Sequence, residues 1–395
     1  MFTIGQEEID AVAEVINTRR LFRYGGETEG RAAACERRIT EIFGCSESLI
    51  VTSGTGALIC GLVGLGIGPG DEVIVPAYTW LASAGAVLSV GAIPVLADVD
   101  ETLTLDPDDF ERRIGPRTKV VIPVHMAGRP ADMDRILAVA KARGVAVLED
   151  SCQAVGGSYK GRRLATIGDA GALSFNVYKN ITCGEGGALL TNNRQVFERA
   201  LYHHDMGSSF RGHTLIEPEF LGNSYRMNEI QAAVLHVQLG RLDGIIARLR
   251  ERRDWIRDAI QAADTPLTLS PSADIEGDCG LHVSFLFGTA DTRIRFSERA
   301  AELGCTLSSP IDSGKHVYTN WTTLLERKVG VHPKINPFLW AENRNCRISE
   351  LTPDCCPRTL DLLARTATVD SGFNRTREEC ETLAATLCRV AKELD

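Results

Sequence analysis

Lys179 is the residue whose type and position most strongly suggest chemistry. It stands in an otherwise uncharged stretch, residues 170–181, and the glycine-rich turn GEGG follows at residues 184–187. Most lysines are solvated, so a single lysine indicates little by itself. A lysine between an apolar, strand-like run and a tight turn is less suited to a solubilising role. Its amine could instead attack a carbonyl carbon and form a Schiff base.

Two acids, Glu149 and Asp150, end the strand-like run VAVL. Burying a carboxylate at the end of a strand is costly unless a partner compensates it. One interpretation is a helix cap or a surface turn. The other is a carboxylate in the crevice of a sheet that pairs with a cationic ring nitrogen.

Residues 53–58, SGTGAL, join a strand-like segment to the start of a helix. The free N–H groups and the dipole of a helix start favour a phosphate. The same pattern also fits an ordinary Ser or Thr N-cap. Tyr78, Thr79 and Trp80 follow a second strand-like run, EVIVP, where an aromatic side chain could stack on a flat ring or pack in the core.

Together these groups supply a phosphate site, a stacking face, a carboxylate and an amine. These are the components needed to hold pyridoxal 5′-phosphate (PLP), whose protonated ring accepts electrons from the α-carbon of a substrate. Lys179 would bind the aldehyde, and Asp150 would keep the ring nitrogen protonated. The cysteine spacing contains no C-x-x-C zinc pattern, and we expect no metal site.

The elements that must position these residues follow a regular order. Short apolar segments alternate with helical ones, which indicates a mostly parallel sheet covered on both faces, with functional groups at the carboxyl ends of the strands. We therefore expect an α/β fold with a seven-stranded, mostly parallel sheet. We expect a large PLP-binding domain over residues 1–245 and a smaller C-terminal α/β domain over residues 246–395, including the linking helix. The pattern over residues 227–260 predicts one long helix. The predicted strands are residues 48–53, 72–76, 93–99, 118–125, 145–150, 170–175 and 187–192.

Composition limits the functional classes. The chain has 395 residues and a formal net charge of −9, which argues against nucleic acid as a partner because that normally requires a basic face. The twelve cysteines are scattered and are expected to be reduced thiols in a cytoplasmic protein. Neither a signal peptide nor an apolar run long enough for a membrane helix is evident, so no membrane association is expected.

Several long, ordered motifs resemble one family. They include SGTGAL, GDEVIVPAYTW, LEDSCQAVGGSYKGR, KNITCGEGG and LGNSYRMNEIQAA. The chain resembles the DegT/DnrJ/StrS family of PLP-dependent sugar aminotransferases, which have the aspartate-aminotransferase fold (PLP-dependent transferase fold type I). The resemblance runs from about residue 48 to residue 243 and weakens after about residue 264.

The resemblance implies roles for individual residues. Lys179 matches the lysine that binds the cofactor aldehyde, and Asp150 matches the partner of the pyridine nitrogen. Asn223 matches an asparagine that reaches the phosphate of a neighbouring subunit, which implies a homodimer with shared sites. The other cofactor contacts that the motifs imply are Thr55, Gly56 and Ser174 at the phosphate, Trp80 on the ring face and Gln153 near the ring hydroxyl.

The implied reaction is a ping-pong amino transfer from glutamate or glutamine to a keto or aldehyde group of a sugar, octulosonate or cyclitol. Relatives with histidine in place of the lysine dehydrate sugars, so Lys179 favours transamination. Another PLP chemistry on the same fold (dehydratase, decarboxylase or lyase) and a non-catalytic PLP-binding regulator remain alternatives. In residues 310–340, His316 and Tyr318 are candidate substrate contacts, although this segment could equally be an ordinary domain-interface loop.

Overall fold

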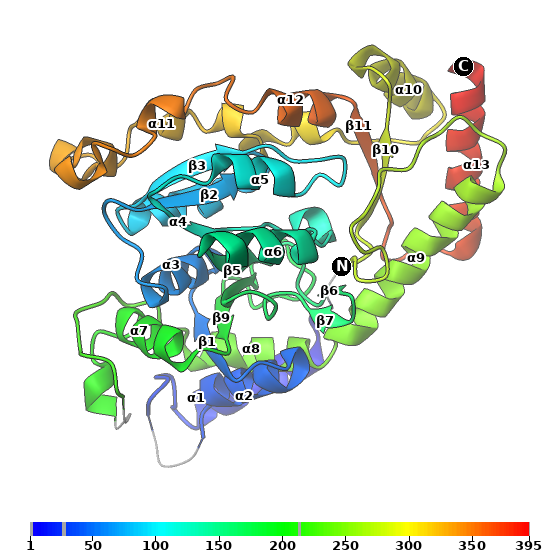
Figure 1. Ribbon diagram of the computed structural model, residues 1–395. Coiled ribbons are helices and arrows are strands. Elements are labelled where there is room, and N and C mark those ends of the chain that lie inside the picture. Colours follow the sequence, from blue (N-terminus) through cyan, green and yellow to red (C-terminus); the bar gives the residue numbers. More distant parts are fainter. Residues whose placement is uncertain (1–2, 26–28, 212–214, 395) are drawn as a thin grey trace.

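A computed structural model describes residues 3–25, 29–211 and 215–394. Its centre is a seven-stranded sheet in the order β1-β9-β8-β5-β4-β2-β3 (Figure 1). Only β9 runs antiparallel to its neighbours within this sheet. The predicted fold class is confirmed, and each of the seven predicted strands is present. Their bounds are β1 Glu47–Val51, β2 Glu72–Pro76, β3 Ile93–Ala97, β4 Thr118–Val121, β5 Ala146–Asp150, β8 Ala170–Ser174 and β9 Gly187–Thr191.

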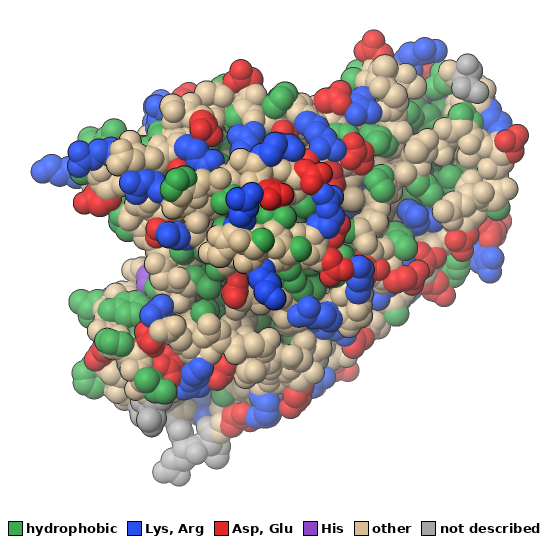
Figure 2. Space-filling model, viewed as in Figure 1, with side chains coloured by type: hydrophobic (Ala, Val, Ile, Leu, Met, Phe, Trp, Pro, Cys, Tyr) green, Lys and Arg blue, Asp and Glu red, His purple; other side chains and the backbone are tan. Residues whose placement is uncertain are grey.

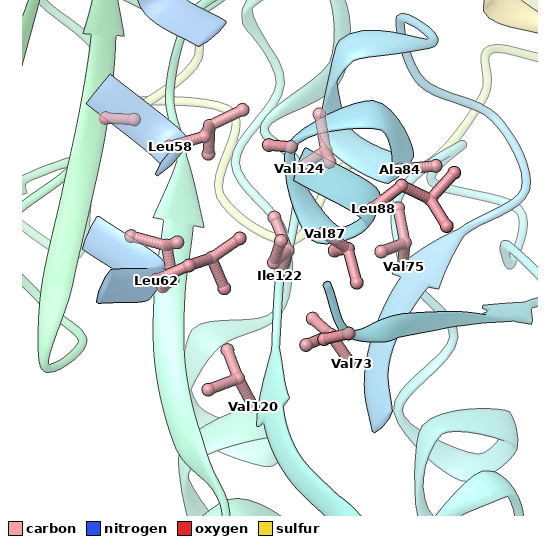
Figure 3. Close-up of a cluster of buried hydrophobic side chains, with 14 of the residues drawn as sticks. Leu58, Leu62, Val73, Val75, Ala84, Val87, Leu88, Val120, Ile122 and Val124 are labelled. Carbon is pink, nitrogen blue, oxygen red and sulfur yellow. The ribbon is translucent and has the colours of Figure 1, made fainter. Parts of the chain in front are cut away.

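Helices cover both faces of the sheet because successive strand residues point to opposite sides. In β2, Val73 and Val75 belong to one buried cluster, whereas Ile74 belongs to the other. Figure 3 shows Val73 and Val75 with side chains of two helices, among them Leu58 and Val87. Each fully buried aliphatic side chain contributes about 1.5–3 kcal/mol. The first cluster includes residues of α3 (Gly54–Gly64), α4 (Ala82–Ser89) and α7 (Arg194–His204), and the second includes residues of α2 (Arg31–Phe43), α5 (Pro107–Arg113), α6 (Met133–Arg143) and α8 (Glu229–Leu239).

The single long helix expected over residues 227–260 is wrong. The structure has two helices, α8 and α9 (Leu242–Ala262), separated by Gly240 and Arg241. Glycine costs about 1 kcal/mol in a helix interior relative to alanine. Here the N–H of Gly240 donates a tight hydrogen bond to the carbonyl of Val237 (3.0 Å), which ends α8.

A third buried cluster joins α9 to the C-terminal elements. In Figure 1, α9 and α13 lie side by side at the right of the molecule. The expected division into residues 1–245 and 246–395 stays a prediction. The elements of this cluster are β10 (His282–Leu286), its antiparallel partner β11 (Thr366–Asp370), α10 (Ala290–Glu302) and α13 (Arg377–Leu394).

The chain between α10 and α12 is a succession of short turns that crosses the edge of the main sheet near β2 and β3 (Figure 1). Tyr318 and Trp321 are fully buried there and belong to the first sheet cluster. This segment is therefore packed on the sheet. The remaining elements are α1 (Gln6–Asn17), β6 (Ser158–Tyr159), β7 (Arg162–Arg163), α11 (Thr322–Leu325), α12 (Pro357–Ala364) and short 3₁₀ turns, among them η1 (Met126–Gly128) and η3 (Pro310–Asp312).

Lysine and arginine are interspersed with acidic side chains on the face seen in Figure 2. Among the described residues, no helix combines the length and the apolar character needed to cross a membrane.

Candidate active site

A cavity of about 500 Å³ lies beside the carboxyl ends of β5 and β8 and the start of α3. Its wall includes Thr55, Trp80, Asp150, Ser174 and Lys179, which come from four separate segments of the chain. Parallel strands bring their carboxyl ends to one edge of a sheet, as the strand pattern predicted. The other lining residues are Ser53, Gly54, Leu58, Ala82, Cys152, Gln153, Asn176, Tyr178, Glu185 and His316.

The N-terminus of α3 forms one end of this cavity. Ser53 caps the helix, and its Oγ accepts a hydrogen bond from the N–H of Gly56 (3.0 Å). Gly54 lies so close to Ser174 and Cys152 that an added Cβ would come within 2.8 Å of each. Glycine therefore allows the helix start to approach the end of β8, and the helix dipole makes this end suited to an anion. Gly56 does not line the cavity, and its N–H is occupied by the cap.

The two acids that end β5 have different environments. Glu149 is fully buried and accepts hydrogen bonds from three backbone N–H groups, those of residues 165, 167 and 168, and it pairs with His125 (3.0 Å). Asp150 instead faces the cavity. Its carboxylate accepts hydrogen bonds from Ser83 Oγ (2.7 Å) and from the N–H of Cys152 (3.1 Å). Glu149 is thus a structural residue, and Asp150 is the carboxylate available to a ligand.

The loop that carries Lys179 is held by buried polar side chains. Asn180 Nδ2 donates to the carbonyl of Val155 (2.9 Å), and Thr182 Oγ1 donates to the carbonyl of Phe175 (3.0 Å). Gly184 has φ +87°, a conformation that favours glycine. The turn returns the chain into β9, and these anchors set the position of the Lys179 amine at the cavity wall.

Two thiols near the lysine are unsuited to nucleophilic chemistry. Burial, reinforced by the Asp150 charge, raises the pKa of Cys152 well above its ordinary value. Burial likewise raises the pKa of Cys183 to about 12. Because the thiolate is the reactive form, both cysteines are expected to be inert at neutral pH.

Trp80 and His316 form the wall opposite the helix start. Their ring centroids are 5.2 Å apart at an interplanar angle of 56°. Burial lowers the pKa of His316, and the nearby Lys179 charge lowers it further. Gln153 lies on the same wall and, like His316, also lines an adjoining second cavity. A neutral imidazole and an amide therefore mark the passage between the two cavities.

Besides Gly56, two further predicted residues, Tyr318 and Asn223, do not line the cavity. Tyr318 is fully buried, and its hydroxyl donates to the carbonyl of Pro353 (2.6 Å). Tyr318 is therefore a core residue and not a substrate contact. Asn223 has an exposed side chain and does not line the cavity of its own chain. That position is compatible with the expected contact to a neighbouring subunit.

Sequence reasoning missed Ser83, Asn176 and Glu185. Ser83 is fully buried behind Asp150, and Asn176 Nδ2 donates to Glu185 Oε1 (2.8 Å) at the cavity wall. Glu185, the acid of the GEGG turn, was available as a signal because it is close to Lys179 in sequence. No local pattern marks Ser83, which is separated from Asp150 by 67 positions.

The described residues fit PLP. The start of α3 and Ser174 suit its phosphate, Asp150 suits its ring nitrogen, and the Lys179 amine can bind its aldehyde. Trp80 offers an aromatic face on the same cavity, and the close approach that Gly54 allows places the start of α3 beside Ser174. The fold and the site thus define a PLP-dependent enzyme.

Comparison with known proteins identifies the family. Residues 3–301 match the model of the DegT/DnrJ/EryC1/StrS aminotransferase family. The chain is 36% identical, over 84% of its length and 83% of the relative, to the spore coat polysaccharide biosynthesis protein SpsC of Bacillus subtilis. The chain belongs to the DegT/DnrJ/EryC1/StrS family and is a PLP-dependent aminotransferase.

Solved structures agree with this assignment. The crystal structure of 3-amino-5-hydroxybenzoic acid (AHBA) synthase superposes with a TM-score of 0.77 at 26% identity and covers 99% of this chain and 97% of its own. DesV of S. venezuelae superposes with a TM-score of 0.77 at 27% identity, covering 98% of this chain and 95% of its own. The resemblance in the motifs is therefore confirmed across the whole fold.

Proposed function

We propose that this aminotransferase moves an amino group from glutamate or glutamine to a keto or aldehyde group of a sugar, octulosonate or cyclitol. The observation that carries the proposal is that the Lys179 amine and the Asp150 carboxylate line one cavity with the N-terminus of α3. A lysine at this position favours amino transfer over the dehydration that histidine-containing relatives perform.

The proposed cofactor contacts are residues that line the cavity. Thr55 and Ser174, with the first N–H groups of α3, would hold the phosphate. Asp150 would face the ring nitrogen, and Trp80 would cover a ring face. Gln153 would lie near the ring hydroxyl. When bound, PLP supplies an electron sink that makes the α-carbon of the donor acidic.

The chain's own residues would then bind, orient and move protons. The Lys179 amine lines the cavity, where it would act as the base that takes the α-proton of the donor. Ser83 and the N–H of Cys152 keep Asp150 in one orientation during both halves of the reaction. The same residues would serve when a carbonyl substrate replaces the departed oxo acid, which predicts ping-pong kinetics.

The acceptor class rests on the relatives and on the cavity. One relative is named for spore coat polysaccharide biosynthesis, and a structural neighbour is named as an AHBA synthase. His316 would contact the acceptor, because its imidazole lines both the lysine cavity and the adjoining one.

A homodimer would complete the site. Asn223 is exposed and would reach the phosphate in the partner subunit. Tyr178, next to the lysine, is 88% exposed although it lines the cavity. Large apolar side chains are also exposed in the chain after α7, at Phe210, Ile216 and Leu221. In Figure 1 the segment after α7 lies at the lower left, where Figure 2 shows hydrophobic side chains on the surface. Such a patch is typical of a protein interface.

The proposed domain division places the cofactor site in residues 1–245 and a substrate-selecting part in residues 246–395. The third buried cluster, which joins α9 to β10, β11, α10 and α13, supports this division.

The test is a panel of amino donors and carbonyl acceptors with the PLP-loaded protein. Glutamate or glutamine should bleach the visible absorbance of the cofactor, and a keto-sugar or keto-cyclitol should restore it, with the aminated product identified by mass. If no donor changes the absorbance, a different PLP chemistry or a binding role is indicated. If the absorbance bleaches but the product is deaminated or decarboxylated, amino transfer is contradicted.

A further inference from the structure

A second cavity, of about 430 Å³, adjoins the lysine cavity. Gln153 and His316 line both, so a ligand could extend from one into the other. Residues of the turn after β4 line the second cavity, together with residues of the paired strands β10 and β11 and of the chain just before η3. Apart from Gln153 and His316, the residues that line this cavity have no role in the cofactor site proposed above.

Arg129 is the charged group on the floor of the second cavity. It is only 6% exposed, and the one hydrogen bond that its side chain makes among the described residues runs from Nη1 to the carbonyl of Thr102 (3.3 Å). No carboxylate of the described chain lies within ion-pair distance of it. A guanidinium has five N–H donors and is costly to bury without partners. Burial lowers the pKa of Arg129, and the charges of Asp278 and Tyr78 only partly oppose this.

Two acidic side chains lie near Arg129, but one is bonded to other groups and the other is exposed. Asp278 accepts from the N–H of Gly280 (2.6 Å) and lies 3.7 Å from the guanidinium of Arg253. Asp312 lines the cavity but is exposed. The Arg129 guanidinium therefore has no directly paired carboxylate among the described residues.

Strand β10 presents polar atoms that have no partner in the described chain to the same cavity. His282 and Ser284 alternate along β10 and share the face that lines the cavity. Ser284 is 2% exposed, and its Oγ has no hydrogen-bond partner in the described chain. His282 Nδ1 also lacks a partner there. Burial lowers the pKa of His282, so the imidazole is neutral at pH 7 and can donate a hydrogen bond without adding charge.

The backbone around Arg129 has positive φ angles at several positions. Ala127 has φ +53° and Leu103 has φ +63°, values uncommon for residues other than glycine, and both residues line the cavity. Gly128 has φ +87°, and an added Cβ would come 2.9 Å from Cys279 Cβ. The N–H of Cys279 donates to the carbonyl of Gly128 (2.9 Å). Strained backbone of this kind persists where the surrounding structure over-determines it, and it concentrates at ligand sites.

We propose that Arg129, Ser284 and His282 bind a carboxylate of a substrate that reaches the lysine cavity past Gln153 and His316. A carboxylate matches the planar fork of a guanidinium and accepts from a hydroxyl and an imidazole N–H. Two sources present this chemistry: the amino-acid donor and an acidic acceptor such as a keto-sugar acid. The assignment of the carboxylate to a substrate rests on the proposed aminotransferase function, whereas binding of a carboxylate does not.

The first experiment measures binding to the PLP-loaded protein by titration calorimetry. The probes are glutarate for the donor and D-glucuronate for an acidic acceptor, with glucose as the neutral comparison. The wild type should bind at least one acid and not glucose. Arg129→Gln should weaken that binding by roughly tenfold or more, since a charge-assisted hydrogen bond is lost, and Ser284→Ala should weaken it less.

The control is Arg135→Gln, because Arg135 is an exposed arginine paired with Asp108 on the surface. This variant should bind like the wild type. Unchanged cofactor absorbance and unfolding temperature show that Arg129→Gln still folds, and Arg129→Lys, which keeps the charge, should retain intermediate binding. Equal binding by Arg129→Gln and the wild type, or no binding of either acid by the wild type, overturns the proposal.

Kinetics then separate the two sources. If the donor supplies the carboxylate, Arg129→Gln raises KM for glutamate in the donor half-reaction and leaves the acceptor half-reaction unchanged. The reverse pattern assigns the carboxylate to the acceptor. If no donor bleaches the wild-type cofactor, the aminotransferase proposal fails while the calorimetric result on Arg129 still stands.

Discussion

Ser83 donates a hydrogen bond of 2.7 Å to the carboxylate of Asp150, and both side chains are buried. Thr79 lies 2.8 Å from the same serine hydroxyl, so a short chain of polar groups links the start of α4 to the end of β5. This relationship gives Asp150 a fixed orientation toward the cavity. It makes Ser83 a positioning residue for the group that would face the cofactor ring.

Ser83→Ala should lower kcat more than it raises KM for the donor. Loss of a hydrogen bond to a charged, buried group costs about 1.5–3 kcal/mol, or roughly ten- to a hundredfold. The visible spectrum and the dissociation of PLP should change as well, because Asp150 would no longer be held in place. The matched control is Ser89→Ala on the same helix, since Ser89 is exposed and only bonds the carbonyl of Gly85. Equal kinetics for Ser83→Ala and Ser89→Ala would contradict the positioning role.

Lys179→Met should abolish amino transfer, with a loss of at least about a hundredfold, because the proton-transferring amine is removed. PLP should still bind through the α3 end of the cavity. Borohydride should attach the cofactor covalently to Lys179 in the wild type and to no residue in the variant, as read by peptide mass. Cys183→Ala is the control: burial raises the pKa of this thiol to about 12, so its removal should leave turnover nearly unchanged. A covalent adduct in Lys179→Met would show that another residue binds the aldehyde.

Much of the fold and of the candidate site could be predicted from the sequence. The seven strands are short apolar runs bounded by turns, and they alternate with helices, which predicts a parallel sheet. Asp150 and Ser174 each end a strand and Lys179 follows one closely, so the sheet itself brings them to one cavity. Their positions along the chain, at or just after the ends of strands, were therefore sufficient to predict that they meet in one site.

The remaining features depend on contacts between distant parts of the chain. The role of Ser83 depends on its contact with Asp150, and the role of Arg129 depends on its position beside strand β10, which contains Ser284. No spacing in the sequence encodes those pairings. Tyr318 was expected at the site because it is polar and aromatic beside His316. The short turns of residues 310–320 have no regular period, so the sequence did not show that His316 faces the cavity while Tyr318 is buried in the core.

Arg347→Met should destabilise the fold by about 3–5 kcal/mol, because it leaves a buried carboxylate unpaired. Glu72, at the start of β2, is 2% exposed and accepts from Arg347 Nη2 (2.6 Å), Nε (3.0 Å) and backbone N–H (2.8 Å). The pair ties the segment that includes His316 to the sheet. Denaturant unfolding should show the loss, and the double variant Glu72→Met/Arg347→Met should recover most of it. If the single and double variants are equally unstable, the unpaired carboxylate is not the cause.

His204 should make stability decrease as the pH falls. Burial lowers the pKa of His204 to about 3, and the charges of Arg23 and Arg226 act in the same direction, while Asp205 and the Leu201 carbonyl oppose it. Below the unfolded pKa of about 6.5, the imidazole is protonated in the unfolded chain but stays neutral in the folded chain. The free energy of unfolding therefore decreases between about pH 6.5 and 3, by up to ~1.4 kcal/mol per pH unit. The free energy of unfolding of His204→Asn should decline less steeply over that range than that of the wild type. The exposed His332→Asn should follow the wild type, and parallel curves for all three proteins would contradict the assignment.

Mixing two inactive variants should restore activity if Asn223 completes the site of a partner subunit. Lys179→Met removes the amine, and Asn223→Asp would place a negative charge where the phosphate of the partner's cofactor is expected to lie. In a mixed dimer, one site carries both defects and the other carries neither. Random exchange of equal amounts should therefore return about a quarter of the wild-type sites, measured as turnover after dissociation and reassembly. Gel filtration with light scattering should show a dimer throughout. If both parent variants are inactive and their mixture stays inactive despite confirmed exchange, each chain uses its own Asn223 or does not use it at all.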